Sequence, residues 1–263
     1  MKQNYSIKVL LVIAVAFFAT ADNATAQSNN DQISVQNVQI SIAAAQIVSA
    51  THDAVSDTYE EFACIRDLSV SQQAEGDKFN TNDIVSRTIN KSDLTQNGNG
   101  YSFYSAIIGY DAYPIVSKVL LQEVSYWLTS RKKRKAAIDQ AKSNVVKNLS
   151  QIESSEPTFK YSSLYRGMLH VIGQMNKDCK KTVYIYTNGV ENYIHNFYDV
   201  KDWNAEYETI KKTLLTDMKV PNVKNLEIVF LSSGRDEITV QSLRFWARFF
   251  SEHGINTTVR ASI

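Results

Sequence analysis

The sequence predicts an α/β domain in which a largely parallel β-sheet carries helices on both faces. Short apolar runs of buried-strand length alternate with longer amphipathic segments from Glu61 onward, which is the pattern of such a sheet. Interruptions are few, since the chain of 263 residues contains only 3 Pro and 9 Gly. This length suffices for one large domain or two small ones.

The apolar runs and amphipathic segments give the expected elements in chain order. The expected strands are 61–67, 103–110, 121–128, 182–187, 226–231 and 256–262. The expected helices are 81–95, 131–152, 162–176, 204–216 and 238–253. The helix at 131–152 has the clearest pattern, because its apolar residues recur on one stripe. These residues are Ala137, Ile138, Ala141, Val145, Leu149 and Ile152.

Residues 1–26 have the pattern of a signal peptide. Lys2 and Lys8 accompany an apolar core, Val9 to Ala19, and a small-residue cleavage pattern ends at Ala26. The core is shorter than the roughly 20 residues of a membrane span. We therefore expect an exported protein, periplasmic or extracellular, without a stable membrane span after cleavage.

Residues 27–58 are rich in Gln, Asn, Ser and Ala, and we expect them to form a spacer or a docking helix. The domain itself is expected to occupy residues 59–263. Its composition is ordinary for a globular protein, because the net charge is +1 and 44% of the residues are hydrophobic. The sequence therefore gives no reason to expect nucleic acid as a partner.

A polar motif follows the first expected strand, in the sequence Asp67-Leu68-Ser69-Val70-Ser71. Alternate residues of an extended segment point to the same side, so Asp67, Ser69 and Ser71 could converge. A carboxylate with two hydroxyls suits Mg²⁺, Mn²⁺ or Ca²⁺ better than zinc. The alternative is a polar loop in which Asp or Ser caps a helix.

Two further segments place similar groups at matching positions. Ser162-Ser163 stands just before an expected helix, and Thr187-Asn188-Gly189 ends an expected strand. The D-x-S-x-S pattern, the hydroxyl residue that opens a helix and the strand ending in T-N-G together resemble the von Willebrand factor type A (vWA) domain. In that family three such loops build the metal-ion-dependent adhesion site (MIDAS).

The resemblance covers residues 59–263 and implies a Rossmann-like three-layer sandwich. The segment YSAIIGYDAYPIVSKVLL is similar to the second strand of the family and its short antiparallel partner. LEIVFLSSG, ITVQSLRFWARFFSEHG and INTTVRASI are similar to the closing strand, helix and strand.

The resemblance also implies the metal ligands. These are Asp67, Ser69, Ser71, Ser162 and Asn188. Ser162 stands where the family usually has Thr, and Ser163 replaces it if the register differs by one. Asn188 stands where the family usually has Asp, which leaves one formal negative charge and should weaken the affinity for Mg²⁺, Mn²⁺ or Ca²⁺.

For function, the resemblance implies protein binding in adhesion or complex assembly rather than catalysis. A partner protein supplies an Asp or Glu to the open coordination position of the metal. Two alternatives stay open: a degenerate, metal-free structural subunit, and a metal-dependent hydrolase that uses Asp67 as ligand or nucleophile. The hydrolase would lack a general base, because no His or Glu lies in the candidate loops apart from Glu191 beyond Asn188.

Two other features have an expected structural role. In the vWA family the first and fourth strands are parallel neighbours, which would place Asp67 and Asn188 level and Cys64 and Cys179 about 20 Å apart along the strands. The resemblance therefore implies two free thiols. The basic run Arg131–Lys135 is expected to be a solvated helix start, with a partner-binding surface as the alternative.

Overall fold

The structure is a computed structural model and describes most of the predicted domain. The described ranges are 56–69, 79–90, 93–96, 98–109, 114–123, 130–156, 160–232 and 234–260. The signal peptide, nearly all of the spacer and Ser71 lie outside these ranges, and what we expect of them stays a prediction. Within the described ranges, no helix combines the length and apolar character needed to cross a bilayer.

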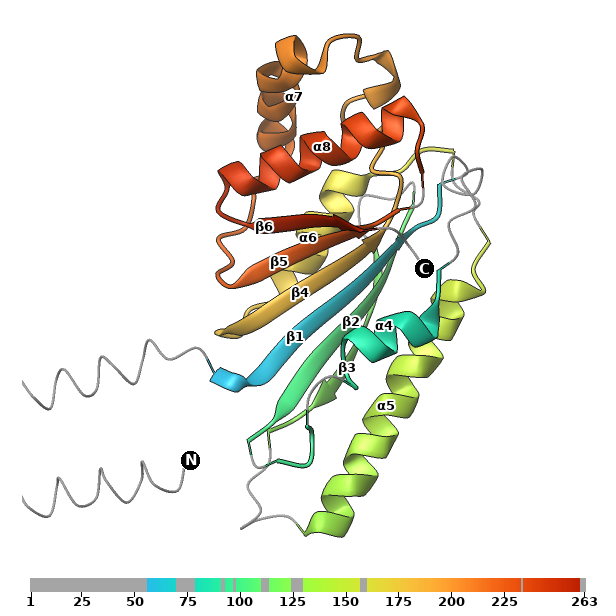
Figure 1. Ribbon diagram of the computed structural model, residues 1–263, viewed down its shortest axis with the longest axis vertical. Helices are drawn as coiled ribbons and strands as arrows, with labels where there is room; N and C mark the ends of the chain where they lie inside the picture. Colours follow the sequence, from blue (N-terminus) through green and yellow to red (C-terminus); the bar gives the residue numbers. More distant parts are fainter. Residues whose placement is uncertain are drawn as a thin grey trace, which may run out of the picture. The chain divides into compact units, whose positions relative to one another are not determined.

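Six strands form one sheet in the order β3-β2-β1-β4-β5-β6 (Figure 1). They are β1 (Ser56–Asp67), β2 (Gly100–Ile108), β3 (Ile115–Leu121), β4 (Cys179–Tyr186), β5 (Leu226–Leu231) and β6 (Asn256–Arg260). Every neighbouring pair is parallel except β2 and β3, which are antiparallel. This confirms the predicted fold class, including the single antiparallel strand.

Helices cover both faces of the sheet, so the domain has three layers (Figure 1). One face packs on α6 (Leu164–Gln174), α7 (Trp203–Asp217) and α8 (Glu237–Glu252), and the other packs on α4 (Thr81–Arg87) and α5 (Arg131–Glu153). A short 3₁₀ helix, η2 (Phe197–Asp199), precedes α7.

Alternate residues of each strand enter different cores, as the period of two requires. In β1, Ala63 and Ile65 face the α6 side, whereas Phe62 and Cys64 face the α5 side. Both faces of the central strand are therefore buried, which explains why it reads as a continuous apolar run.

The predicted strand at 121–128 was wrong where the structure describes it: Leu121 is the last residue of β3, Gln122 and Glu123 lie outside any strand, and residues 124–128 lie outside the described ranges. β3 occupies Ile115–Leu121 and pairs with β2 from Ile107↔Ile115 to Tyr101↔Leu121. Apolar residues continue beyond Gln122 and Glu123, so the sequence did not mark the strand boundary, whereas the hairpin partner implied by the vWA resemblance lies at the correct position. Antiparallel pairing with β2 decides between the two interpretations.

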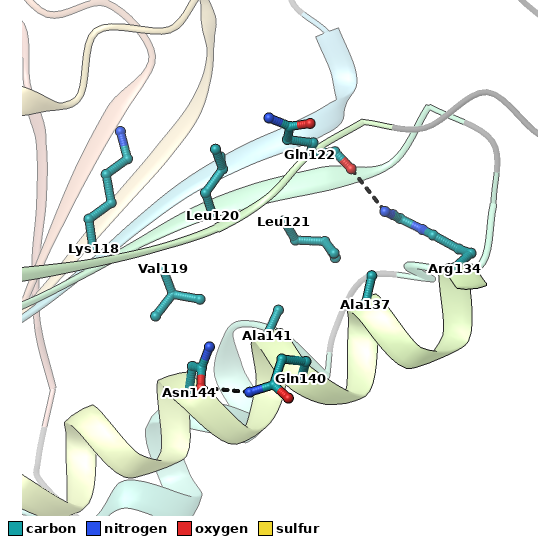
Figure 2. Close-up of a pocket in the computed structure, with 10 residues that line it drawn as sticks. All are labelled: Lys118, Val119, Leu120, Leu121, Gln122, Arg134, Ala137, Gln140, Ala141 and Asn144. Atoms are coloured by element: carbon teal, nitrogen blue, oxygen red, sulfur yellow. Dashed lines mark hydrogen bonds between the residues drawn. The ribbon is translucent and has the colours of Figure 1, made fainter. Parts of the chain in front are cut away.

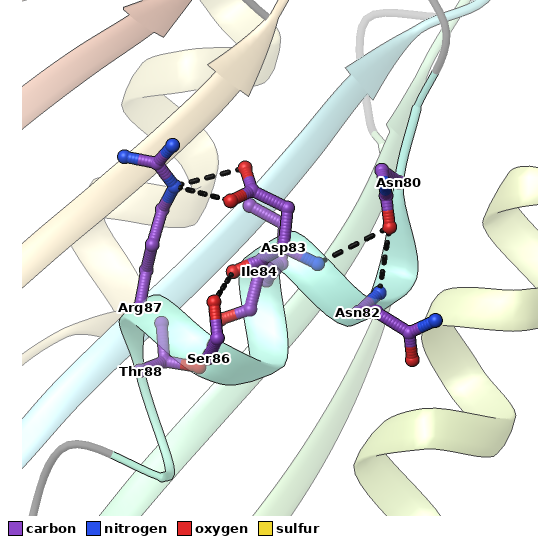
Figure 3. Close-up of polar contacts among 7 residues, drawn as sticks. All are labelled: Asn80, Asn82, Asp83, Ile84, Ser86, Arg87 and Thr88. Atoms are coloured by element: carbon purple, nitrogen blue, oxygen red, sulfur yellow. Dashed lines mark hydrogen bonds and ion pairs between the residues drawn. The ribbon is translucent and has the colours of Figure 1, made fainter. Parts of the chain in front are cut away.

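Helix α4 is shorter than the predicted 81–95 and ends at Arg87. Asn80 caps its start by accepting from the backbone N–H groups of Asn82 and Asp83, at 3.0 and 3.2 Å (Figure 3). Thr88 leaves the helical conformation, and its hydroxyl donates to the Ile84 carbonyl at 2.7 Å. The residues that follow reach the core from loop segments rather than from a helix.

Cys64 and Cys179 are both free and buried, as the resemblance implied. Cys64 pairs with Tyr184 across the β1–β4 ladder, and Cys179 lies beside Ser56. The register differs by one residue from the expected one. Arg66 pairs with Tyr186, so that Asp67 is level with Thr187 rather than with Asn188.

The basic run at the start of α5 is only partly solvated. Arg131, Lys132, Lys133 and Lys135 are exposed, but Arg134 is buried. Its guanidinium donates to the carbonyl of Leu94, at 3.0 and 3.1 Å. It donates to the carbonyl of Gln122, at 2.8 Å, as Figure 2 shows. It also donates to the Asn99 carbonyl. Arg134 therefore ties the helix to the loop before β2 and to the end of β3.

A cavity of about 450 Å³ lies beside Arg134, between β3 and α5 (Figure 2). Val119 and Leu121 line it from the strand, and Ala137 and Ala141 line it from the helix. None of the four predicted metal ligands that the structure describes, Asp67, Ser69, Ser162 and Asn188, lines this cavity.

Replacing Arg134 by Ala should lower the free energy of unfolding by about 3 kcal/mol, because three carbonyls, among them that of the buried Leu94, would lose a charged donor. Lys135→Ala, one residue away and exposed, should change it by less than about 0.5 kcal/mol. Urea denaturation measures both. Equal effects of the two substitutions would contradict the bridging role of Arg134.

Candidate functional site

The candidate site lies at the carboxyl-terminal edge of the sheet, where β1 and β4 end side by side. β1 is followed in sequence by β2 on one side, while β4 pairs on its other side, so the connections diverge at this point. Ligands of open α/β sheets bind in the crevice at such a switch point. Asp67 ends β1, and Thr187 and Asn188 follow β4.

The Asp67 carboxylate joins three segments of the chain. Its side chain is 0% exposed. Oδ1 accepts from the backbone N–H of Ser69 at 2.9 Å. Oδ2 accepts from the hydroxyl of Thr187 at 2.9 Å and from that of Ser162 at 3.4 Å. The structure therefore brings together Asp67, Ser69 and Ser162 of the predicted set.

Thr187 is a site residue that the sequence analysis did not include among the ligands. Its hydroxyl donates to Asp67 and accepts from the backbone N–H of Gly189 at 2.9 Å. The signal was present in the strand ending Thr187-Asn188-Gly189. The predicted register placed Asn188 level with Asp67, and for this reason the contact of Thr187 with Asp67 was missed.

Asn188 is buried next to Thr187, and its side-chain oxygen accepts from the Val190 N–H at 3.1 Å. The turn continues through Gly189, which has a positive φ of 79°. A Cβ at this position would lie 2.9 Å from the Leu243 side chain. Glycine is thus required for both its backbone conformation and the close approach of α8.

Ser163 places a second hydroxyl at this edge. It is the residue before α6, but its side chain makes no capping hydrogen bond. Its hydroxyl is buried and has no hydrogen-bond partner in the described part of the chain. A buried polar atom of this kind in a native structure calls for an explanation such as an ion or a water.

Glu191 takes over the capping role at the start of α6. It is 0% exposed, and Oε2 accepts from the Tyr165 N–H at 2.8 Å. Oε1 accepts from the N–H groups of Tyr193 and Ile194, at 2.8 and 3.1 Å. The carboxylate is far in sequence from the helix that it caps, so no local pattern indicated this role.

Burial raises the pKa of both carboxyl groups in this region. The pKa of Glu191 rises from 4.5 to about 7 through burial, with a smaller contribution from the charge of Asp67, against the opposing effect of three N–H donors. The pKa of Asp67 is also raised by burial, while hydrogen bonds from Ser69, Thr187 and Ser162 act to lower it.

The neighbouring guanidinium of Arg66 makes its hydrogen bonds elsewhere. It donates to the carbonyls of Glu153 and Ser155, both at 3.0 Å, and to that of Ile152, at the end of α5. Its positive charge therefore interacts with the carbonyl groups at the carboxyl-terminal end of α5.

The donor set fits a hard divalent cation. The oxygen donors at this edge are Asp67, Ser69, Ser162, Ser163, Thr187 and Asn188. In the described ranges no group of three or more His, Cys, Asp or Glu side chains could hold a metal. The donor set at this edge consists mainly of hydroxyl groups and contains a single carboxylate. Such oxygen donors suit Mg²⁺, Mn²⁺ or Ca²⁺ and not zinc. A cation would also offset the buried charge of Asp67.

No known protein family matches the sequence, and no curated protein matches it. Among solved structures, the chain is similar to proximal thread matrix protein 1 from the mussel byssus, with a TM-score of 0.34 and 14% identity over 78% of this chain and 42% of that one. It is also similar to the pilus adhesin SpaC from Lactobacillus rhamnosus GG, with a TM-score of 0.41 and 10% identity over 79% and 28%. A third similar structure is the human COPII-coat protein Sec24c, with a TM-score of 0.34 and 9% identity over 78% of this chain and 30% of that one. The chain thus spans less than half the length of each of these proteins.

The raised pKa of Glu191 predicts a pH-dependent stability. Because its pKa in the folded state lies above that in the unfolded chain, the folded state binds more protons between about pH 4.5 and 7. The contribution to stability is present below this window and is lost as the pH rises through about 7. Urea denaturation of the wild type and Glu191→Gln between about pH 4.5 and 8 measures it, in the presence of a chelator.

In that experiment the wild type should lose stability relative to Glu191→Gln as the pH rises. A stability difference that stays constant across the window would contradict a pKa near 7.

Proposed function

We propose that this chain is an exported protein-binding module of the vWA type, with a divalent-cation site at the carboxyl-terminal edge of its sheet. One observation carries the proposal. The buried Asp67 carboxylate accepts hydrogen bonds from hydroxyl groups of two other loops, at the switch point of the sheet. These loops are the ones that the vWA resemblance assigns to a metal-ion-dependent adhesion site.

The residues that would hold the ion are oxygen donors on three loops. Asp67 would supply the charge, Ser69 and Ser71 the hydroxyls of the first loop, and Ser162 or Ser163 a hydroxyl of the second. Asn188 would supply a neutral amide oxygen, directly or through water. The ion would contribute an open, Lewis-acidic coordination position that a carboxylate of a partner protein completes.

The chemistry of these loops supports binding rather than catalysis. The acidic side chain nearest to Asn188 in this loop is Glu191, and three backbone N–H groups already engage its oxygens. A general base needs an oxygen or nitrogen within hydrogen-bond reach of the substrate proton. We therefore propose adhesion or complex assembly, and no enzymatic activity.

A metal-free structural module is the second candidate. Asn188 favours it, because an amide in place of a carboxylate halves the formal charge of the set. The hydrogen bonds to both oxygens of Asp67 also favour it, since they satisfy the carboxylate without an ion. The two candidates differ in one measurable property, the affinity for divalent cations.

Export of the protein is part of the proposal and rests on the first 26 residues. Their lysines, apolar core and small-residue pattern have the order of a signal peptide. The partner would then be a protein of the periplasm, the cell surface or the extracellular space.

Calorimetric titration of Mg²⁺, Mn²⁺ and Ca²⁺ tests the metal site. The wild type should bind at least one of these ions with a Kd on the order of 10⁻⁴ to 10⁻³ M, given a single carboxylate among the ligands. Asp67→Ala and the isosteric Asp67→Asn should both lose binding. Asp139→Ala removes an exposed carboxylate from α5 and serves as the matched control with unchanged binding.

No binding by the wild type would favour the metal-free module. Equal loss in Asp139→Ala would show a nonspecific charge effect instead.

Metal-dependent capture tests the binding function. Immobilised wild-type protein should retain a partner from the native envelope fraction in Mg²⁺ and release it with a chelator. Asp67→Asn should not retain the same protein, whereas Asp139→Ala should. A partner retained equally in chelator and by Asp67→Asn would place the binding surface elsewhere.

A further inference from the structure

Two loops of the candidate site are joined to each other by neighbouring side chains, Glu191 and Asn192. Glu191 accepts from the Tyr165 N–H at the start of α6, at 2.8 Å. Asn192 accepts from the Ser162 N–H, at 2.7 Å. The loop after β4 therefore holds the loop before α6 on both sides of Ser163. We call this pair of contacts the loop clamp.

Glu191 also fixes the loop that carries it. Its second carboxylate oxygen accepts from Tyr193 and Ile194, and its backbone carbonyl accepts from the Phe197 N–H at 2.9 Å. Phe197 is buried, with its ring centroid 5.6 Å from that of Trp246 in α8. The clamp is thus anchored in the core and not in an exposed turn.

Trp246 anchors the same loop at its other end. Its indole N–H donates to the Gly189 carbonyl at 2.7 Å. The segment between Gly189 and Phe197 is therefore held at both ends by α8, and Glu191 lies within it.

We infer that Glu191 is a positioning residue of the cation site: its carboxylate sets the relative position of the two loops that carry Ser162 and Asn188. This inference rests on the proposed function. Outer-shell groups that orient ligands typically change metal affinity by about 10- to 100-fold when they are replaced. Glu191 contacts the backbone of the ligand loops and not the ion.

The carboxylate form matters because its two oxygens accept from three N–H groups, one at the start of α6 and two in the loop after β4. A glutamine has the same shape but only one acceptor oxygen. Its NH₂ group would face an N–H donor on one of the two loops. Glu191→Gln should therefore keep the packing and break one side of the loop clamp.

Glu61→Gln is the matched control. Glu61 is also 0% exposed and lies on β1, and its carboxylate accepts from the Lys177 N–H and the Tyr104 hydroxyl, both at 3.2 Å. Lys177 precedes β4, so this carboxylate sits toward the sheet edge opposite to Asp67. Both substitutions replace a buried carboxyl group that accepts from a backbone N–H, but only one acts on the candidate site.

The experiment compares wild type, Glu191→Gln, Asn192→Ala and Glu61→Gln by two measurements. One is calorimetric titration with Mg²⁺, and the other is hydrogen exchange of backbone amides in the presence of a chelator. Asn192→Ala removes the second contact of the loop clamp from a side chain that is only partly buried, so it tests the idea even if Glu191→Gln folds poorly.

We expect Glu191→Gln to bind Mg²⁺ about tenfold more weakly, or worse, and to exchange faster at Tyr165, Tyr193 and Ile194. Asn192→Ala should exchange faster at Ser162 and bind more weakly. Glu61→Gln should keep the Mg²⁺ affinity and the exchange rates of these amides, whatever its stability.

Equal losses of affinity in Glu191→Gln and Glu61→Gln would overturn the inference, because the effect would then follow from stability alone. Unchanged affinity in Glu191→Gln and Asn192→Ala would overturn it too, while leaving the metal site intact. No binding of Mg²⁺, Mn²⁺ or Ca²⁺ by the wild type would contradict the proposed function itself, and with it the role of Glu191 toward an ion.

Discussion

The arrangement of the loops at the carboxyl-terminal edge of the sheet depends on the hydrogen bonds to the buried carboxylate of Asp67. An ionised carboxylate without water costs several kcal/mol unless hydrogen bonds or a cation compensate for it. Here the Ser69 amide and the hydroxyls of Thr187 and Ser162 provide the hydrogen bonds. These donors come from three chain segments, so the burial of one side chain requires three loops to meet at one point.

The strand order makes that meeting possible. β1 lies at the centre with β2 and β4 as parallel neighbours, so the loops leaving these strands emerge at the same edge. The helices then fix the loops in place: Trp246 of α8 holds Gly189, and Glu191 caps α6. The site is therefore a consequence of the layered fold, with its polar groups supported from the core side.

The sequence predicted the fold class and most of the strands, because apolar runs mark buried strands. The meeting of the loops was implied by the resemblance to the vWA domain. Asp67 and Ser162 were predicted to meet, and they do. Thr187 was missed because the register was off by one residue. Glu191 and Arg134 were assigned no contacts, since a charged residue that bonds distant backbone groups has no local pattern to reveal it.

The most direct test of the account is the position of a cation. Anomalous diffraction from crystals of the wild-type protein grown with Mn²⁺ locates the ion without reference to any binding assay. We predict a peak within about 2.6 Å of an Asp67 carboxylate oxygen, with a serine hydroxyl of the second loop at a similar distance. A well-ordered Asp67 that keeps its hydrogen bonds to Thr187 and Ser162, with no anomalous peak beside it, would contradict the account.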